Sequence, residues 1–259
     1  MKLKISTMLD YAIEMPADLL VQIEVAYMPS QNVVEERFAP GETTHLSRIA
    51  AEDYIGTRVW LHCTDRLVCR YDAVVEVTRE AVDLASLKQD PVHLLPHEAV
   101  RYLMASRYCP SDEFQSFVQA DFGKLAGGAL IRALADWIGN SFTYAPGSSL
   151  STTTALDTFV QRRGICRDFA HVLVTLARAA AIPARMVSAY GPDVTPQDFH
   201  ALVEVWLEGR WHLVDPTGMT TPDRVAIIGV GRDAADIAFL TSYGWVNLQN
   251  QTVAVEAIE

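Results

Sequence analysis

Apolar and polar residues alternate through much of the first third of the chain. Apolar side chains stand at every second position in three segments: residues 21–27, 59–63 and 73–77. This period of two places them on one face of a β-strand. Turn residues separate the segments at Pro40-Gly41 and at 64–66. Short strands divided by turns predict an antiparallel sandwich or barrel over the N-terminal part of the chain.

Farther along, the apolar positions repeat with the period of a helix. The first such face predicts a helix that ends near Gly139-Asn140, and it consists of Leu130, Leu134, Trp137 and Ile138. A shorter helix should begin at the capping residues 151–154 and run through Arg162. We expect Gly164 to close it from a left-handed conformation.

A third helix follows directly, with Cys166 at its start and Pro183 after its end. Its apolar face consists of Phe169, Leu173, Leu176, Ala177 and Ala180. Three successive alanines at 179–181 leave few polar residues on its other side, so this helix should lie inside the domain. The unpaired N–H groups and the dipole at a helix start favour an anion, and therefore favour the thiolate form of a cysteine placed there.

Segment 198–215 predicts a β-hairpin. Two runs rich in β-branched and aromatic residues flank Glu208-Gly209, which is a turn pair. A two-residue turn places Asp215 diagonal to His200 on one face of the ribbon, about 7–8 Å away, within reach of a carboxylate–imidazole hydrogen bond. A three-residue turn would move Asp215 to the other face.

The composition is that of an ordinary globular protein of one or two domains. Of its 259 residues, 50% are hydrophobic and 20% are charged. We expect an N-terminal β-sandwich-like domain over 1–90 and a second domain over 91–259, joined by a linker near 87–96. The closing run 245–255 should add strands to the sheet of the second domain.

Charge and cysteine content exclude several classes of function. The formal net charge of −11 argues against nucleic acid or an anionic membrane surface as a partner. No signal peptide or membrane-length apolar run is evident, so we expect a cytoplasmic protein. The chain has no CxxC pair, and its cysteines (Cys63, Cys69, Cys109 and Cys166) do not indicate a disulfide framework or a zinc site. We therefore expect neither a metal nor a cofactor.

Cys166, His200 and Asp215 together suggest nucleophilic catalysis. In this order they would serve as nucleophile, as base and as the group that orients the base. The competing interpretation is structural, because free cysteine is among the most buried residue types and usually only packs. A histidine with an aspartate on its own strand face makes the catalytic interpretation the stronger one.

Four blocks of sequence resemble the bacterial transglutaminase-like cysteine peptidases. They are Gly164-Ile165-Cys166-Arg167-Asp168-Phe169-Ala170-His171, Ile182-Pro183-Ala184-Arg185, Asp198-Phe199-His200-Ala201 and Arg210-Trp211-His212-Leu213-Val214-Asp215-Pro216-Thr217. The resemblance implies an α+β fold, in which an N-terminal antiparallel β domain precedes a papain-like core of helices packed on an antiparallel sheet. It also implies that Cys166, His200 and Asp215 form the catalytic triad. Leu202 departs from the family, which often has tryptophan there on the active-site face.

Other polar residues near these blocks receive weaker assignments. His171 lies about 140° round the helix from Cys166 and should not meet the thiol. His212 is on the opposite face of its strand from the predicted site, so we expect it at the surface. Glu204 shares the face of His200 and is a candidate for contact with substrate.

The expected chemistry is acyl transfer at a peptide or protein amide through a thioester on Cys166. Hydrolysis is favoured because water is always present, and the alternative is transfer to an amine, as in a transglutaminase. The Cys166 backbone N–H should form part of the oxyanion hole. A binding module that keeps the fold without activity is the rival class, and a metal-dependent hydrolase is a third that insensitivity to chelators would exclude.

Overall fold

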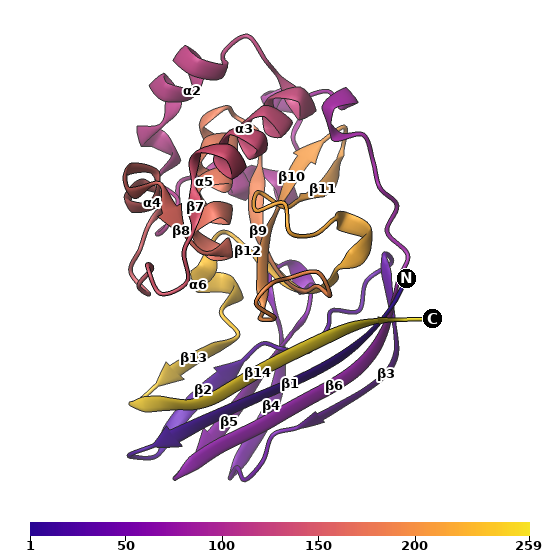
Figure 1. Cartoon of the computed structure of the whole chain (residues 1–259), viewed down its shortest axis with the longest axis vertical. Coiled ribbons are helices and arrows are strands. Elements are labelled where there is room, and N and C mark those ends of the chain that lie inside the picture. The colour runs from indigo at the N-terminus through magenta and orange to yellow at the C-terminus, as the bar shows by residue number, and fades with distance from the viewer.

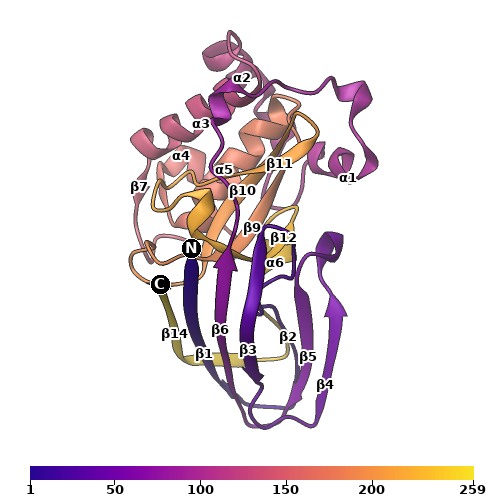
Figure 2. The same ribbon diagram turned by 90° about the vertical axis from the view of Figure 1, so that its right-hand side faces the viewer.

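The N-terminal alternation builds two antiparallel sheets that pack face to face. The computed structural model describes residues 1–259, and Figures 1 and 2 show these sheets on one side of a helical layer. One sheet has the order β14 (Val246–Ile258), β1 (Lys2–Ile13), β6 (Arg66–Val77), β3 (Gln31–Ala39). The other has the order β13 (Leu240–Tyr243), β2 (Ala17–Val21), β5 (Thr57–Cys63), β4 (His45–Ala50). We call these two sheets the β unit.

Alternate side chains of both sheets fill the space between them. On β1, Leu3, Ile5 and Leu9 are fully buried, whereas Lys4 and Ser6 on the other face are exposed. They belong to one cluster with Leu19 of β2 and Leu61 of β5. Burial of this shared apolar face is what holds the two sheets together. The predicted N-terminal antiparallel β region is therefore confirmed, and its two sheets also include β13 and β14 from the other end of the chain.

Two predictions about strands were wrong. Residues 22–27 alternate in sequence but lie outside the sheets, because β2 ends at Val21. Their backbone instead bonds to the second half of the chain, since Ala26 N–H donates to Ile227 O at 2.8 Å. The closing run 245–255 joins β1, not the sheet of the second domain, with Lys2 opposite Ile258. The β unit thus contains both ends of the chain (Figure 1).

The remaining residues form a layer of helices on a second antiparallel sheet, which we call the core unit. The sheet has the order β11 (Arg210–Val214), β10 (His200–Leu207), β9 (Ala184–Tyr190), β12 (Ala226–Gly231). The helices are α1 (His97–Val100), α2 (Gln115–Phe122), α3 (Gly127–Ser141), α4 (Ala155–Gln161), α5 (Cys166–Ala179) and α6 (Ala234–Ile237). A short parallel pair joins β7 (Thr143–Tyr144) to β8 (Arg163–Gly164). The predicted α+β architecture is confirmed.

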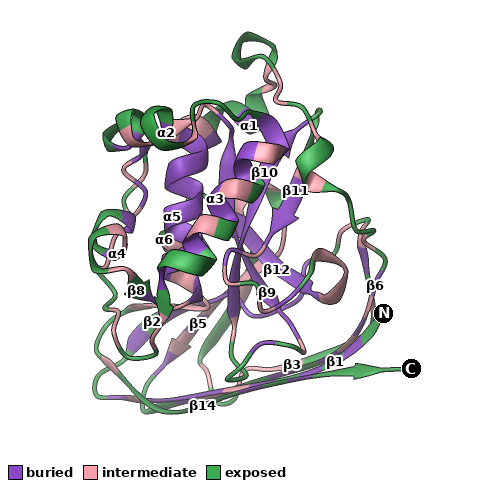
Figure 3. Cartoon of the chain, turned by 45° about the horizontal axis from the view of Figure 1, so that its top comes forward, coloured by how far each residue is buried: buried purple, intermediate pink, exposed green.

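Helix α5 lies at the centre of the core unit, as its sequence predicts. Nearly all of its residues are buried, and in Figure 3 it is the purple helix behind α3. Its apolar side chains pack on the odd-numbered residues of β10, from Ala201 to Leu207. The opposite face of the sheet carries a smaller cluster that includes Leu202 and Ile227. Helix α5 is therefore enclosed along its length, and only Arg167 in its first turn and Ala179 at its end are partly exposed.

Helix α4 ends in a different way from the predicted one. Thr154 caps its start as expected, and its side chain accepts a hydrogen bond from Asp157 N–H. The left-handed residue at its end is Arg162, with φ 56°, and not Gly164. Gly164 is needed for another reason: a Cβ there would lie 2.7 Å from the Cβ of Asp168.

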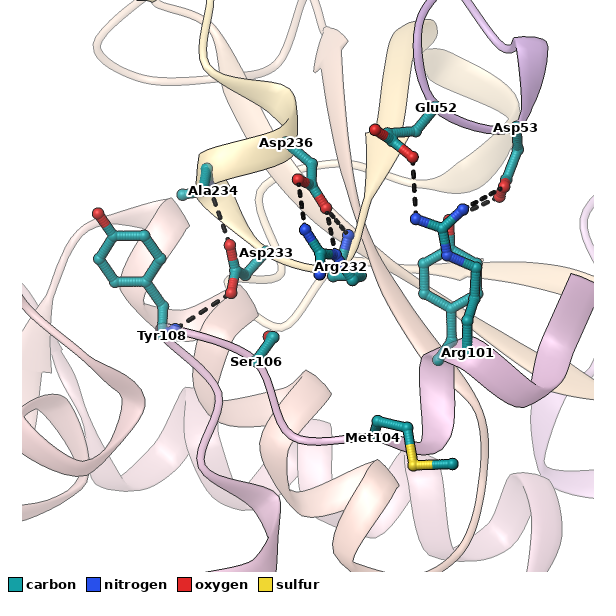
Figure 4. Close-up of polar contacts among 12 residues, drawn as sticks. Glu52, Asp53, Arg101, Met104, Ser106, Tyr108, Arg232, Asp233, Ala234 and Asp236 are labelled. Carbon is teal, nitrogen blue, oxygen red and sulfur yellow. Dashed lines mark hydrogen bonds and ion pairs between the residues drawn. The ribbon is translucent and has the colours of Figure 1, made fainter.

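Charged side chains join the β unit to the core unit. The segment η1 (Glu52–Tyr54) lies between β4 and β5 and presents two carboxylates to the core unit. Figure 4 shows Arg101 facing both of them, at 2.9 Å from Glu52 and 3.3 Å from Asp53. Asp53 also pairs with the buried Arg185 of β9 at 2.8 Å. The two units are thus joined by ion pairs as well as by apolar contacts.

None of the helices is both long enough and apolar enough to cross a membrane.

Candidate active site

The start of α5 holds Cys166 in a fixed position at the edge of the core unit. Ile165 N–H donates to Asp168 Oδ2 at 2.9 Å, so this carboxylate caps the helix it belongs to. Asp168 is fully buried, and Ser149 Oγ and Arg167 donate to its other oxygen. The helix start is therefore anchored to the loop before α4. Cys166 keeps 9% of its surface exposed, with its thiol 4.0 Å from Phe199 O.

The hairpin that carries His200 and Asp215 has the predicted register. Leu207 pairs with Arg210 across a two-residue turn. Glu208 and Gly209 both adopt positive φ, 51° and 75°, as a type I′ turn requires. The pairing continues to the end of β11, and Asp215 follows directly. The turn thus sets which face of the ribbon carries the carboxylate.

His200 and Asp215 form a buried pair. His200 Nε2 lies 2.9 Å from Asp215 Oδ2, and both side chains are almost inaccessible. Asp215 Oδ2 also accepts from Thr220 N–H at 3.0 Å, and Oδ1 accepts from the N–H and hydroxyl of Thr217. Four donors therefore hold the carboxylate in one orientation. His200 Nδ1 has no hydrogen-bond partner, so it is the ring nitrogen left to face the thiol.

Cys166, His200 and Asp215 are brought together in this arrangement. Burial by itself lowers the pKa of His200, but the hydrogen bond to Asp215 and the contact with Cys166 outweigh it and raise that pKa to about 10. Burial alone would raise the pKa of Asp215, but its bonds with His200 and Thr217 hold that pKa below its ordinary value. Both shifts favour a protonated imidazole beside an ionised carboxylate. Such an imidazolium in turn favours the thiolate form of a neighbouring cysteine.

Tyr144 also lies at this site, although no pattern in the sequence indicates it. Tyr144 belongs to β7 and lies opposite Gly164, which is two residues before Cys166. Its ring packs against Phe169 of α5 at 6.0 Å between centroids. Its hydroxyl lies beside the Cys166 side chain and backbone N–H. A two-residue strand is too short to show any periodicity.

Two other histidines are buried outside the site. His171 is remote from the thiol, as predicted: it stacks on Tyr108, and its Nε2 accepts from Ala234 N–H. His212 was expected at the surface, and this is wrong, because it is 8% exposed and hydrogen-bonded to Leu207 O. It packs in the fold and has no part in the site.

Glu204 and Leu202 do not line an open cleft, although both share the strand face of His200. Glu204 is 5% exposed and pairs with Arg185 at 2.7 Å. Arg185 also stacks on Trp211 and is needed for the contact with η1. Leu202 is 1% exposed and belongs to the small apolar cluster on that side of the sheet. The structure therefore assigns both residues to packing, not to contact with substrate.

The other cysteines differ from Cys166 in their surroundings. Burial raises the pKa of Cys63, and it raises those of Cys69 and Cys109 to about 12. All of the cysteines are free thiols. No group of three or more His, Cys, Asp or Glu side chains converges as metal ligands would.

Comparison with known proteins finds one family model and one solved structure that match the region of the site. The family model of the transglutaminase-like superfamily matches residues 118–216, a segment that contains Cys166, His200 and Asp215. The crystal structure of a "putative cysteine protease" from Cytophaga hutchinsonii is similar over 100% of this chain and 91% of that chain, with a TM-score of 0.95 and 31% identity. The similarity therefore includes the β unit as well as the core unit.

Curated relatives match over shorter segments. An uncharacterised protein of Mycobacterium leprae is 34% identical over 116 residues, which is 41% of this chain and 41% of the relative. A protein-glutamine gamma-glutamyltransferase of Pseudomonas aeruginosa is 33% identical over 111 residues, which is 38% of this chain and 17% of that protein. The chain thus spans less than half the length of the curated relatives it matches.

Proposed function

Because the chain belongs to the transglutaminase-like superfamily, we propose that it is a cysteine-dependent hydrolase of amide bonds in peptides or proteins. Cys166 is the nucleophile, His200 the general acid and base, and Asp215 the group that orients His200. The observation that supports this most directly is the pairing of His200 Nε2 with Asp215 at 2.9 Å, which leaves Nδ1 free beside the thiol.

The reaction proceeds in two halves. The thiolate of Cys166 attacks the amide carbonyl carbon, and the carbonyl π electrons move to oxygen. When the carbonyl re-forms, the C–N bond breaks and the imidazolium of His200 gives its Nδ1 proton to the leaving amine. Neutral His200 then takes a proton from water, and the resulting hydroxide attacks the thioester. Collapse releases the carboxylic acid and restores the thiolate–imidazolium pair.

Asp215 stabilises this cycle without exchanging a proton. Its carboxylate accepts from Nε2–H, so the tautomer with Nδ1 toward the thiol is favoured whenever His200 is neutral. When His200 is charged, the adjacent negative charge stabilises the imidazolium. The donors from Thr217 and Thr220 keep the carboxylate from rotating away.

Transfer to an amine is the second candidate, because a glutamyltransferase shares 33% identity over 111 residues of this chain. The two activities share the thioester and differ only in the group that attacks it. Hydrolysis is the simpler proposal because water needs no binding site of its own.

The test begins with the reactivity of the thiol. Each cysteine is labelled with iodoacetamide across a range of pH and quantified by peptide mapping, in the wild type and in His200→Ala. We expect Cys166 to label much faster than Cys63, Cys69 and Cys109 on the acid side of neutrality, and to lose this advantage in the variant. Equal labelling of all four cysteines, unchanged by the variant, would refute the proposed function.

The acceptor is then identified with casein as a general protein substrate. Hydrolysis predicts new amino termini or released ammonia, both absent in Cys166→Ala, and no incorporation of a fluorescent cadaverine. Incorporation of cadaverine that depends on Cys166 would instead establish amine transfer.

A further inference from the structure

Tyr144 lies where the developing negative charge of the reaction would appear. Attack by Cys166 converts the carbonyl oxygen of the substrate into an oxyanion, which needs hydrogen-bond donors aimed at it. The Cys166 backbone N–H at the start of α5 supplies one donor, since no earlier carbonyl of the helix can accept from it. A second donor should lie beside that N–H and beside the thiol. Tyr144 occupies that position: it lies opposite Gly164, two residues before Cys166, its ring packs on Phe169 three residues after Cys166, and its hydroxyl interacts with Cys166.

The backbone around Tyr144 fixes this position. Ala145 N–H donates to Gly164 O at 2.8 Å, and Thr143 N–H donates to Arg162 O at 2.9 Å. These bonds tie β7 to the segment that leads directly into Cys166, so the two residues are held in a constant relation. Phe169, one turn along α5, packs against the Tyr144 ring and limits its rotation.

We propose that the Tyr144 hydroxyl is the second oxyanion donor of the acyl-transfer reaction. This rests on the proposed function, because it assigns a role within the same site. As the sulfur–carbon bond forms, the electron pair of the carbonyl moves to its oxygen, which accepts from the Cys166 N–H and from the phenol. When the carbonyl re-forms, the leaving group departs and both donors are released without loss of their protons.

The electrostatic environment keeps the phenol in its donating form. Burial raises the pKa of Tyr144, and the negative charge of Cys166 raises it further, to about 12. The hydroxyl therefore remains protonated at neutral pH. The side chain is only half-buried, so a carbonyl oxygen of a substrate has a route to it.

Two electrophiles that react with the same thiol distinguish stabilisation of the oxyanion from an effect on the thiolate. p-Nitrophenyl acetate acylates a cysteine through a tetrahedral oxyanion, whereas iodoacetamide alkylates it by displacement at a saturated carbon, where no oxyanion forms. Tyr144→Phe removes the hydroxyl and keeps the ring that packs on Phe169. Tyr27→Phe is the matched control, because Tyr27 is exposed in the segment that follows β2 and its hydroxyl bonds only to Glu36.

We expect Tyr144→Phe to slow acylation of Cys166 by about tenfold or more while its alkylation rate stays within about twofold of the wild type. Loss of one oxyanion donor typically lowers the rate of peptide-bond chemistry by about 10²–10³, and the effect on an activated ester is smaller because nitrophenolate leaves easily. Tyr27→Phe should change neither rate.

Three outcomes would overturn the proposal. Acylation at the wild-type rate would show that the hydroxyl has no role in it. Equal slowing of acylation and alkylation would show that Tyr144 acts on the thiolate and not on the oxyanion. Acylation of the wild type that persists in Cys166→Ala would refute the proposed function itself, and the role of Tyr144 with it. The Cys166→Ala measurement therefore distinguishes the two failures.

Discussion

Replacement of Asp215 by asparagine tests the electrostatic basis of the site while it preserves the shape of the side chain. In the wild type, both carboxylate oxygens accept: Oδ1 from Thr217, and Oδ2 from His200 and Thr220. An amide has only one acceptor oxygen. Its NH₂ group must therefore face a backbone N–H, of either Thr217 or Thr220, whichever way the amide turns. Each such mismatch costs about 1–3 kcal/mol.

The same substitution changes the charge and the tautomer of His200. Loss of an opposite charge at this distance lowers the pKa of a histidine by about 1–3 units, which is roughly 1.4–4 kcal/mol. If the amide NH₂ faces His200, Nε2 must accept and Nδ1 must carry the proton, so neutral His200 can no longer act as a base toward Cys166. The equilibrium constant that favours the thiolate–imidazolium pair over the neutral pair should then fall by about 10- to 1000-fold.

The assay is the rate of iodoacetamide labelling of Cys166 against pH, in wild type and in Asp215→Asn. We expect the variant to be slower near neutrality, by up to about 1000-fold, and the two curves to converge in strong base, where the thiol ionises without assistance. Asp193→Asn is the matched control, because it removes one exposed carboxylate that pairs with Arg224. If Asp215→Asn labelled as fast as the wild type over the whole range, the argument that Asp215 stabilises the imidazolium would be wrong.

Three further predictions concern stability. His200 has its pKa raised to about 10 in the folded chain against an ordinary value of 6.5, so its stabilising contribution is complete below pH 6.5 and is lost as the pH rises toward 10. The free energy of unfolding in urea should fall across this window, and fall less in Asp215→Asn; an equal fall in both proteins would contradict the linkage. Gly164→Ala should lower that free energy by about 1–3 kcal/mol, because the new Cβ would lie 2.7 Å from the Cβ of Asp168. Gly139 lies inside α3, and a Cβ added there would have one neighbouring atom, Pro216 O at 3.7 Å. Gly139→Ala should therefore raise the free energy of unfolding by about 0.5–1 kcal/mol in the same urea measurement.

The relation between His200 and Asp215 was predictable because it depends on a local turn. Glu208-Gly209 joins adjacent strands, and the period of two then determines the face of every later residue. The position of Cys166 was predictable for a similar reason, since the helix pattern and the preceding glycine lie within a few residues of it. Each prediction needed only the geometry of one element or of one connection.

The pairing of strands that lie far apart in the chain could not be predicted from the geometry of one element or one connection. The period of β14 marks it as a strand, but nothing in 246–258 indicates that its partner is β1 at the other end of the chain. The alternation of 22–27 is equally misleading, because these residues lie where the two units meet and are mostly buried on both sides. His212 was misplaced for the same reason: its strand face is exposed in an isolated hairpin and covered in the folded protein.

Tyr144 shows what this limit means for function. A nucleophile, a base and an orienting carboxylate can be recognised from chemistry that has a strict order and spacing along the chain. An oxyanion donor need only point at the right place, so any element that passes the nucleophile can supply it. Here that element is two residues long, and it reaches Cys166 because the connection through α4 returns the chain to pair Tyr144 with Gly164. The part of the site with the weakest sequence signal is therefore the part that only the folded structure locates, and measurement of acylation against alkylation is the direct way to test it.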